Sequence, residues 1–201
     1  MRRRVLLVAS LLLARPGLAA TAEGAEAASL LAVLRAGDVV VVLRHGITDR
    51  RQIDTGDLAN RTGQRNLSEA GRAQSQRIGR AVSALGIPLG QVLTSPVFRA
   101  RDTAELAFGT RAAVESMLTA DDYTPDPAQL ARQIAWLRAR TARPSAPGVT
   151  DVLVGHIVPL SMALGRSLAQ AEYPEGGLAV FAAGRLLGVL DAETLFAAAG
   201  V

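Results

Sequence analysis

The feature that most constrains the fold of this chain is an unbroken apolar run, VVVVL, at positions 39–43. A run of this kind, without alternating polar residues, is typical of a strand buried on both faces, as in a parallel sheet with helices on each side. A second buried strand is expected at 151–155, and a shorter strand at 91–94. A chain with these strands must provide helices for both faces of a sheet.

Segments with helical start and stop signals separate the strands. The expected helices are a short one at 30–35, one from the cap Ser68 to Gly86, one that starts at Ser95-Pro96 and ends near Phe108, one that starts at Asp126-Pro127, one at 158–168 and a terminal one at 191–199. Two closing strands are expected at 178–182 and 186–191, and residues 47–65 form a polar loop. Strands that alternate with helices predict an α/β fold, a three-layer α/β/α sandwich around a mostly parallel central sheet.

The N-terminus has the pattern of a targeting segment. Three arginines at 2–4 precede an apolar run at 5–14, and the helix-breaking Pro16-Gly17 and several small residues follow. The pattern predicts a signal peptide over residues 1–22, cleaved after Ala20 or Ala22, because the apolar run is too short to span a bilayer. A retained signal anchor is the alternative. We expect one domain over residues 30–201, exported to a bacterial periplasm and not stably inserted in a membrane after cleavage.

Composition excludes several classes of partner and chemistry. All 22 basic residues are arginine, and without the four in the first fifteen positions the remaining 18 equal the 18 acidic residues. Aromatic residues make up only 3% of the chain, so recognition of nucleic acid by base stacking is not expected. The chain contains no cysteine, which excludes disulfides, thiolate nucleophiles and cysteine metal sites.

Both histidines of the chain directly follow predicted strands. Arg44-His45 comes after the first strand and His156 after the later one, while Ser95 and Arg99 follow the strand at 91–94. The carboxyl ends of parallel strands meet at one edge of a sheet, where ligands bind. A neutral imidazole is a nucleophile, arginine matches phosphate oxygens, and a helix N-terminus at 96–98 would add backbone donors. The pattern predicts phosphoryl transfer through a phosphohistidine.

Two alternatives exist for this pair of histidines. One is a metal site, but neither the HxH nor the HExxH spacing occurs, and the neighbouring arginines would repel a cation. The other is a structural role at the two strand ends. We expect no metal and no other cofactor.

Four sequence blocks extend the pattern: RHGIT at 44–48, QRNLSEAGRAQ at 64–74, LTSPVFRARDTA at 93–104 and LVGH at 153–156. In order and spacing they resemble the histidine phosphatase superfamily (phosphoglycerate-mutase-like, branch 1), in particular its small exported bacterial members. The resemblance covers nearly all of residues 38–182. The RHG triplet alone is weak, whereas four blocks in register are highly specific.

The resemblance implies a phosphoglycerate-mutase-like fold and a metal-independent site. His45 would be the nucleophile that becomes phosphorylated. Arg44, Arg99 and His156 would hold the phosphate oxygens. The hydroxyls that would assist are those of Thr48 and Ser95.

The residue that protonates the leaving group is not determined by the sequence. A phosphate monoester needs such an acid because its leaving group otherwise departs as an alkoxide. In many family members it is a glutamate after the second helix, and the segment here has no clean match. The candidate proton donors are Glu115, Asp121, Asp122, Asp49 and Glu175.

Three functions fit these observations. The first is a phosphatase that acts on a small phosphorylated substrate or on a phosphoprotein through a phosphohistidine on His45. The second is a non-catalytic phosphate-binding or envelope interaction protein. The third is a phosphoglycerate-type mutase, which export and the short segment between Gly109 and Asp126 disfavour because a mutase must enclose its substrate.

Overall fold

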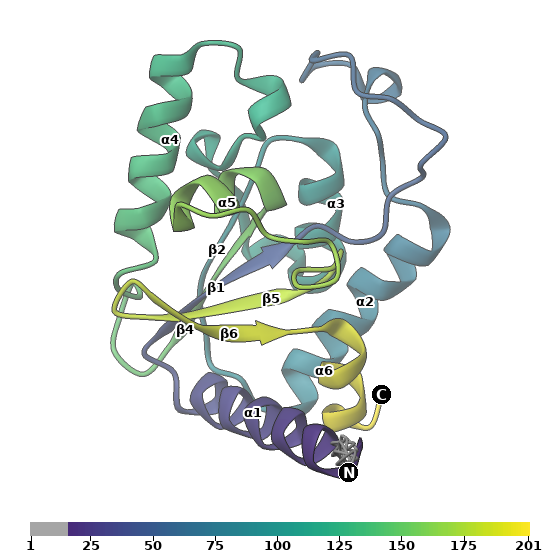
Figure 1. Cartoon of the computed structure of the whole chain (residues 1–201). Coiled ribbons are helices and arrows are strands. Elements are labelled where there is room, and N and C mark those ends of the chain that lie inside the picture. Colours follow the sequence, from purple (N-terminus) through teal and green to yellow (C-terminus); the bar gives the residue numbers. More distant parts are fainter. Residues whose placement is uncertain (1–15) are drawn as a thin grey trace, which may run out of the picture.

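A computed structural model describes residues 16–201, which form a six-stranded sheet with helices on both faces (Figure 1). The strand order is β3-β2-β4-β1-β5-β6, and the four strands from β3 to β1 are mutually parallel. β5 is antiparallel to both of its neighbours. The strands are β1 (Val39–Arg44), β2 (Leu89–Thr94), β3 (Ala112–Val114), β4 (Thr150–Gly155), β5 (Leu178–Ala182) and β6 (Arg185–Leu190). The predicted sandwich with a mostly parallel sheet is confirmed.

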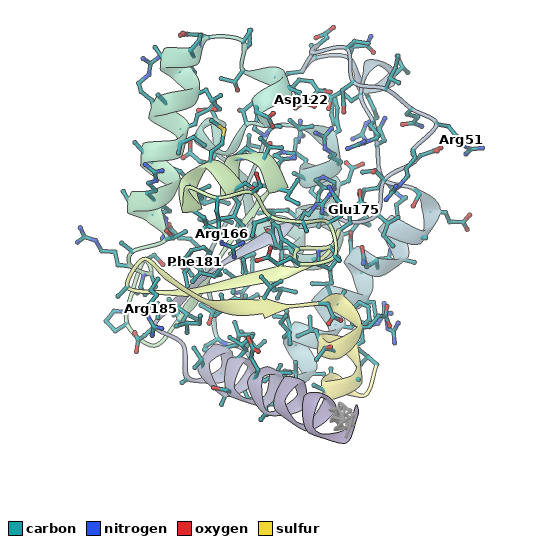
Figure 2. The ribbon with its side chains drawn as sticks, in the orientation of Figure 1. Arg51, Asp122, Arg166, Glu175, Phe181 and Arg185 are labelled. Atoms are coloured by element: carbon teal, nitrogen blue, oxygen red, sulfur yellow. The ribbon has the colours of Figure 1, made fainter. Side chains whose placement is uncertain are left out.

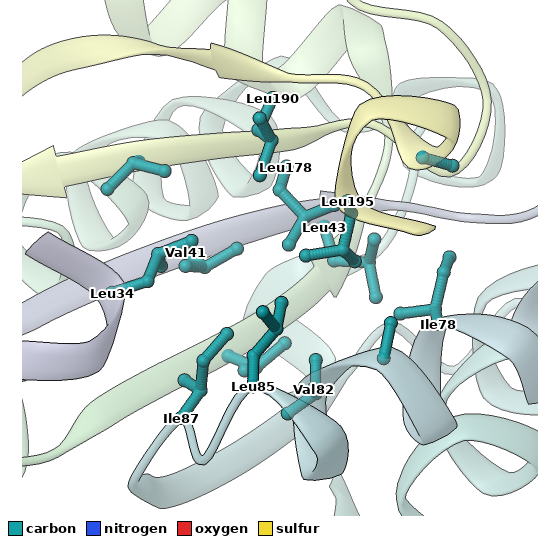
Figure 3. Packing of buried hydrophobic residues seen from close by; sticks show 14 of the residues in the cluster. Leu34, Val41, Leu43, Ile78, Val82, Leu85, Ile87, Leu178, Leu190 and Leu195 are labelled. Carbon is teal, nitrogen blue, oxygen red and sulfur yellow. The ribbon is translucent and has the colours of Figure 1, made fainter. Parts of the chain in front are cut away.

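The unbroken run of β1 supplies apolar side chains to both faces of the sheet. Val39, Val41 and Leu43 pack in a cluster with residues of α1, α2, α3 and α6 (Figure 3), whereas Val40 and Val42 pack on the other face with residues of α4 and α5. Burial on two faces explains why the run has no polar alternation. The helices are α1 (Pro16–Ala36), α2 (Glu69–Ala84), α3 (Phe98–Phe108), α4 (Pro127–Arg140), α5 (Ile157–Leu164) and α6 (Ala192–Ala199).

Several boundaries differ from the sequence-based expectation. α1 begins at Pro16, which is tolerated in a first helical turn, and continues through an alanine-rich stretch of high helix propensity. α3 begins at Phe98 instead of Pro96, and α5 ends at Leu164, where Gly165 adopts a left-handed conformation. The strand β3 was not predicted, because it is only three residues long and its residues are not buried.

Two segments outside the sheet matter for the site. The loop at 47–65 contains one short 3-10 helix, η1 (Arg61–Gly63), and another, η4 (Asp121–Tyr123), precedes α4. Of the predicted signal peptide, residues 1–15 lie outside the described residues, and α1 runs through Ala20 and Ala22. From residue 16 onward, none of the helices combines the length and apolar character that a membrane span requires.

Candidate active site

The central strands bring the two histidines to one edge of the sheet. Arg44 pairs with Gly155 and Thr94 with Val154, so β1, β2 and β4 end at nearly the same level. His45, Ser95 and His156 are the residues that follow these strands. The two imidazole rings lie 5.4 Å apart between centroids, and both histidines are almost completely buried. The predicted convergence of these residues is what the structure shows.

The hydrogen bonding of His45 leaves one ring nitrogen free for attack. Its Nδ1 lies 2.9 Å from the carbonyl oxygen of Gly46, and because a carbonyl only accepts, Nδ1 carries the hydrogen. The lone pair is therefore on Nε2. Burial lowers the pKa of His45 well below 6.5, and the charges of Arg99 and Arg44 add to this effect. The imidazole is thus neutral, as a nucleophile must be.

His156 is held by Ser95 in an orientation suited to a hydrogen-bond donor. Ser95 Oγ accepts a hydrogen bond from the Val97 amide and lies 2.9 Å from His156 Nε2. We assign the serine hydroxyl as donor to Nε2, which places the hydrogen of the neutral ring on Nδ1. That Nδ1 is buried and has no acceptor among the described residues. Burial and the charge of Arg99 lower the pKa of His156 well below 6.5.

Two arginines have buried donors in the same region. Arg44 and Arg99 are each 3% exposed. Arg44 Nη1 donates to the Tyr173 carbonyl at 2.6 Å, yet the Nε of both arginines has no acceptor in the described part of the chain. The Nε atoms of Arg44 and Arg99 and the Nδ1 of His156 are therefore three buried donors, from three different elements, that have no partner among the described residues. Buried donors are normally paired, so their convergence indicates a site for an anion with several oxygens.

Asp54 belongs to this site and was not among the predicted residues. Its carboxylate accepts from Arg99 Nη1 at 2.9 and 3.1 Å, from the Arg65 amide at 2.9 Å and from the Tyr123 hydroxyl. Burial alone would raise the pKa of Asp54, but the hydrogen bonds from Tyr123 and Arg65 and the charge of Arg99 lower it overall. Asp54 is therefore an ionised partner that fixes Arg99. Its place in a polar loop gave no sequence signal.

The structure separates the five candidate proton donors. Asp49 pairs with Arg51 at the surface, and hydrogen bonds from Arg51 lower the pKa of Asp49 to about 2, so this group is ionised. Glu115 caps the 3-10 helix at Ser116–Leu118 by accepting from the Met117 amide. Asp121 has no side-chain contact to a catalytic residue among the hydrogen bonds and ion pairs of residues 16–201. Glu175 and Asp122 remain (Figure 2).

Glu175 lies on the Nδ1 side of His45. Its Oε1 is 4.0 Å from His45 Nδ1 and accepts from the hydroxyl of Thr48 at 2.7 Å. Thr48 therefore holds Glu175, whereas its hydroxyl had been expected to assist the phosphate. A carboxylate in this position favours positive charge on the imidazole ring.

Asp122 lies on the Arg99 side of the site. Its Oδ2 is 3.5 Å from Arg99 Nη2, and its side chain is 42% exposed. Partial burial raises the pKa of Asp122, and the nearby carboxylates of Asp54 and Asp121 add to this against the opposing charge of Arg99. An accessible carboxyl with a raised pKa is the form that a proton donor takes.

The predicted role of the α3 N-terminus was wrong. The Val97 amide is used by Ser95 Oγ, and the Phe98 amide donates to the side-chain oxygen of the fully buried Gln64 at 2.9 Å. These two amides are therefore not free for an anion. Instead they fix Ser95 and the end of the loop at 47–65, whose Gln64 also donates to the carbonyls of Asp57 and Leu58.

The described residues contain no group of three or more His, Asp or Glu side chains placed to hold a metal ion. A neutral imidazole with a free Nε2 lies beside buried arginine donors and a second imidazole. The Glu175 carboxylate lies 4.0 Å from His45 Nδ1, and the carboxylates of Asp54 and Asp122 pair with Arg99. This arrangement is suited to attack on an anionic phosphorus centre.

Comparisons with known proteins point to the family that the sequence blocks resemble. Residues 40–120 match the family model of the histidine phosphatase superfamily (branch 1). An uncharacterized protein of Picosynechococcus sp. (strain ATCC 27264 / PCC 7002 / PR-6) is 32% identical over 122 residues, which are 56% of this chain and 62% of the relative. The chain thus spans less than two thirds of the length of that curated relative. The resemblance inferred from the sequence blocks is confirmed.

Solved structures show the same fold. The protein histidine phosphatase SixA complexed with tungstate is 18% identical with a TM-score of 0.51, over 78% of this chain and 99% of that chain. A phosphoserine phosphatase from Entamoeba histolytica in complex with 3-phosphoglyceric acid is 15% identical with a TM-score of 0.51, over 78% and 98%. At these identities the similarity establishes the phosphoglycerate-mutase-like fold alone.

Proposed function

We propose that this protein is a metal-independent phosphatase that hydrolyses a phosphomonoester, on a small molecule or a phosphoprotein, through a phosphohistidine on His45. The observation that carries the proposal is the juxtaposition of His45, free at Nε2, with buried and unpartnered donors of Arg44, Arg99 and His156. The match of residues 40–120 to the histidine phosphatase family supports it.

In the first half-reaction His45 Nε2 attacks the phosphorus atom. The N–P bond forms as the bond to the ester oxygen breaks, and the arginines and His156 Nδ1 stabilise the negative charge on the three remaining oxygens. The imidazole gains positive charge in this step because its Nδ1 keeps its hydrogen. Glu175, 4.0 Å from Nδ1, stabilises that charge.

The leaving oxygen receives its proton from Asp122. This carboxyl has the raised pKa, whereas Asp54 is ionised by hydrogen bonds from three donors, and Glu175 Oε1 lies 4.0 Å from His45 Nδ1, the nitrogen that does not attack. In the second half-reaction Asp122 accepts a proton from water. The water oxygen then bonds to phosphorus, the N–P bond breaks, and inorganic phosphate leaves with His45 neutral again.

The test is turnover of p-nitrophenyl phosphate in EDTA, with the wild-type chain from Thr21 onward beside His45→Ala. We expect activity that survives EDTA, is absent in the variant, and proceeds through a phosphoenzyme that is stable to base and labile to acid. Activity abolished by EDTA, or equal in the variant, would disprove the mechanism. Phosphate binding without turnover of any ester would favour the non-catalytic alternative.

Asp122 is tested separately with esters of different leaving groups. Asp122→Asn should slow hydrolysis of an alkyl phosphate by about 10²–10⁴-fold, the usual contribution of general acid catalysis. It should affect p-nitrophenyl phosphate much less, because that leaving group needs no proton. Glu175→Gln, the matched control, should slow both esters by a similar factor.

We also propose that the protein is exported by a signal peptide over residues 1–22. The support is the order of charged, apolar and small residues in this segment. N-terminal sequencing of the protein expressed in a Gram-negative host tests the proposal. A periplasmic chain that begins at Thr21 or Glu23 supports it, and a chain that keeps its first twenty residues contradicts it.

A further inference from the structure

Two arginines near the candidate active site have no carboxylate partner among the ion pairs of the described residues. An isolated antiparallel bridge pairs Thr48 with Leu67, and the Asp49 amide donates to the Asn66 carbonyl at 3.0 Å. Arg50 and Arg65 come from the two segments that this bridge joins. Burial lowers the pKa of Arg44, and the charges of Arg65 and Arg50 add to that effect, so both arginines lie near Arg44. Neither forms an ion pair within residues 16–201.

The backbone of Arg65 is fixed to the site. Its amide donates to the Asp54 carboxylate that also binds Arg99, so Arg65 is attached to the same carboxylate as a predicted phosphate ligand. The Arg65 side chain is half-buried, and its Nε is buried without an acceptor in the described chain. The nearby carboxylates are already engaged, Asp54 with Arg99 and Asp49 with Arg51.

Arg65 lies farther out than the other two arginines. Arg44 and Arg99 are each 3% exposed, whereas Arg65 is only half-buried and Arg50 is exposed. The charge of Arg65 lowers the pKa of both histidines, but less than the charges of Arg99 and Arg44 do. A transferred phosphoryl group in contact with His45 therefore lies closest to the inner arginines. Arg65 and Arg50 are then left for a group farther from the phosphorus atom.

We propose that Arg65, with Arg50 beside it, binds a second anionic group on the leaving-group part of the substrate. The preferred substrates are then phosphate esters whose alcohol portion carries a carboxylate or another phosphate, and neutral or purely apolar esters are poorer. Arginine suits this task because its planar donors bind such oxygens in pairs. The inference rests on the proposed function, because it concerns the substrate of the same site.

The test compares 4-carboxyphenyl phosphate with 4-carbamoylphenyl phosphate, which is of similar size but uncharged. Wild-type protein should prefer the carboxylate in kcat/KM by roughly tenfold or more, as expected for a hydrogen bond to a charged group. Arg65→Met should abolish the preference through a higher KM for the carboxylate alone. Arg185→Met is the matched control, because this exposed arginine begins β6 at the opposite end of the sheet, and it should keep the preference.

Three results would overturn the inference. If the wild-type protein has the same kcat/KM for both esters, it binds no second anion. If Arg65→Met loses kcat/KM equally for both esters, Arg65 contacts the transferred phosphate. If Arg65→Met keeps the preference for the carboxylate ester, Arg65 is a surface charge that does not bind the substrate. If neither ester nor p-nitrophenyl phosphate is hydrolysed, the proposed function has failed. The two compounds are then titrated calorimetrically into wild type and Arg65→Met, where tighter binding of the carboxylate in wild type alone supports the inference and equal binding contradicts it.

Discussion

Replacement of Asp54 by asparagine should weaken the fold and strengthen phosphate binding at once. Asp54 is the ion-pair partner of Arg99, and the two side chains are 15% and 4% exposed. Removal of one member of a buried pair leaves the other charge uncompensated and costs about 3–5 kcal/mol. Because asparagine keeps one acceptor oxygen, we expect the lower end, about 3 kcal/mol. For a chain of this size this lowers the melting temperature by about 6–12 °C.

Added phosphate should recover part of that loss. In the wild type Asp54 already neutralises Arg99. In Asp54→Asn the carboxylate left beside Arg99 among the described ion pairs is the more exposed and more distant one of Asp122, at 3.5 Å, so the bound anion becomes the main partner of a buried cation. At an effective dielectric constant of 20, two unit charges interact by about 4 kcal/mol at 4 Å and by less at longer range. We expect the free energy of phosphate binding to improve by about 1.4 kcal/mol, which is modest on that scale and corresponds to binding that is about tenfold tighter. Turnover should nevertheless fall, because Arg99 loses the contact that orients it.

The assay is thermal unfolding with and without inorganic phosphate, together with a calorimetric phosphate titration. Asp102→Asn is the matched control, because Asp102 pairs with Arg61 at 2.6 and 2.9 Å and has no contact with Arg99 among the described ion pairs. It should lose stability without a change in phosphate affinity. Phosphate that binds Asp54→Asn no more tightly than wild type would refute the assignment of Asp54 as the charge partner of Arg99.

Three further outcomes follow from the same geometry. Ser95→Ala removes the group that orients His156 and should reduce kcat/KM by about tenfold or more, with weaker phosphate binding in a titration. Burial and the arginine charges lower the pKa of His45 and His156 well below 6.5, so near pH 6.5 only the unfolded chain takes up protons on these two side chains. The free energy of unfolding, measured in urea, should therefore fall as the pH drops below 6.5 and stay level above it. The acid limb of kcat/KM should lie below pH 6.5. Gln64→Leu leaves the Phe98 amide and two loop carbonyls without a partner and should cost about 1–3 kcal/mol or more in urea unfolding, with faster proteolysis of the loop.

The predictable part of the site is the part that lies next to the strands in sequence. The unbroken runs identify β1 and β4, and residues that directly follow them must lie at the carboxyl edge of a parallel sheet. The places of His45, Arg44 and His156 follow from that argument without knowledge of any tertiary contact. The same logic places Ser95 at the end of β2, although its role as the partner of His156 required the hydrogen bonds.

The unpredictable part depends on contacts between distant segments. Asp54 meets Arg99 across 45 positions and Tyr123 across 69, and no local pattern in a polar loop reports such pairs. The start of α3 was misplaced for the same reason, since Gln64 supplies the acceptor for the Phe98 amide from 34 positions away. Ser95 has the composition of a cap, but its hydroxyl is used on His156.

The division between strand ends and loop is also a division of chemical roles. In the proposed mechanism, groups at the strand ends bind and attack the phosphorus, and their burial keeps both imidazoles neutral beside two arginine charges. A site made only of these groups would hold an anion but would not protonate a leaving group. The loop at 47–65 and η4 supply what is missing: Asp54 neutralises Arg99, and its charge in turn helps to raise the pKa of Asp122. The proposed proton donor, Asp122, thus depends on an ion pair that the strand ends do not contain, so Asp54→Asn should also shift the basic limb of kcat/KM to lower pH.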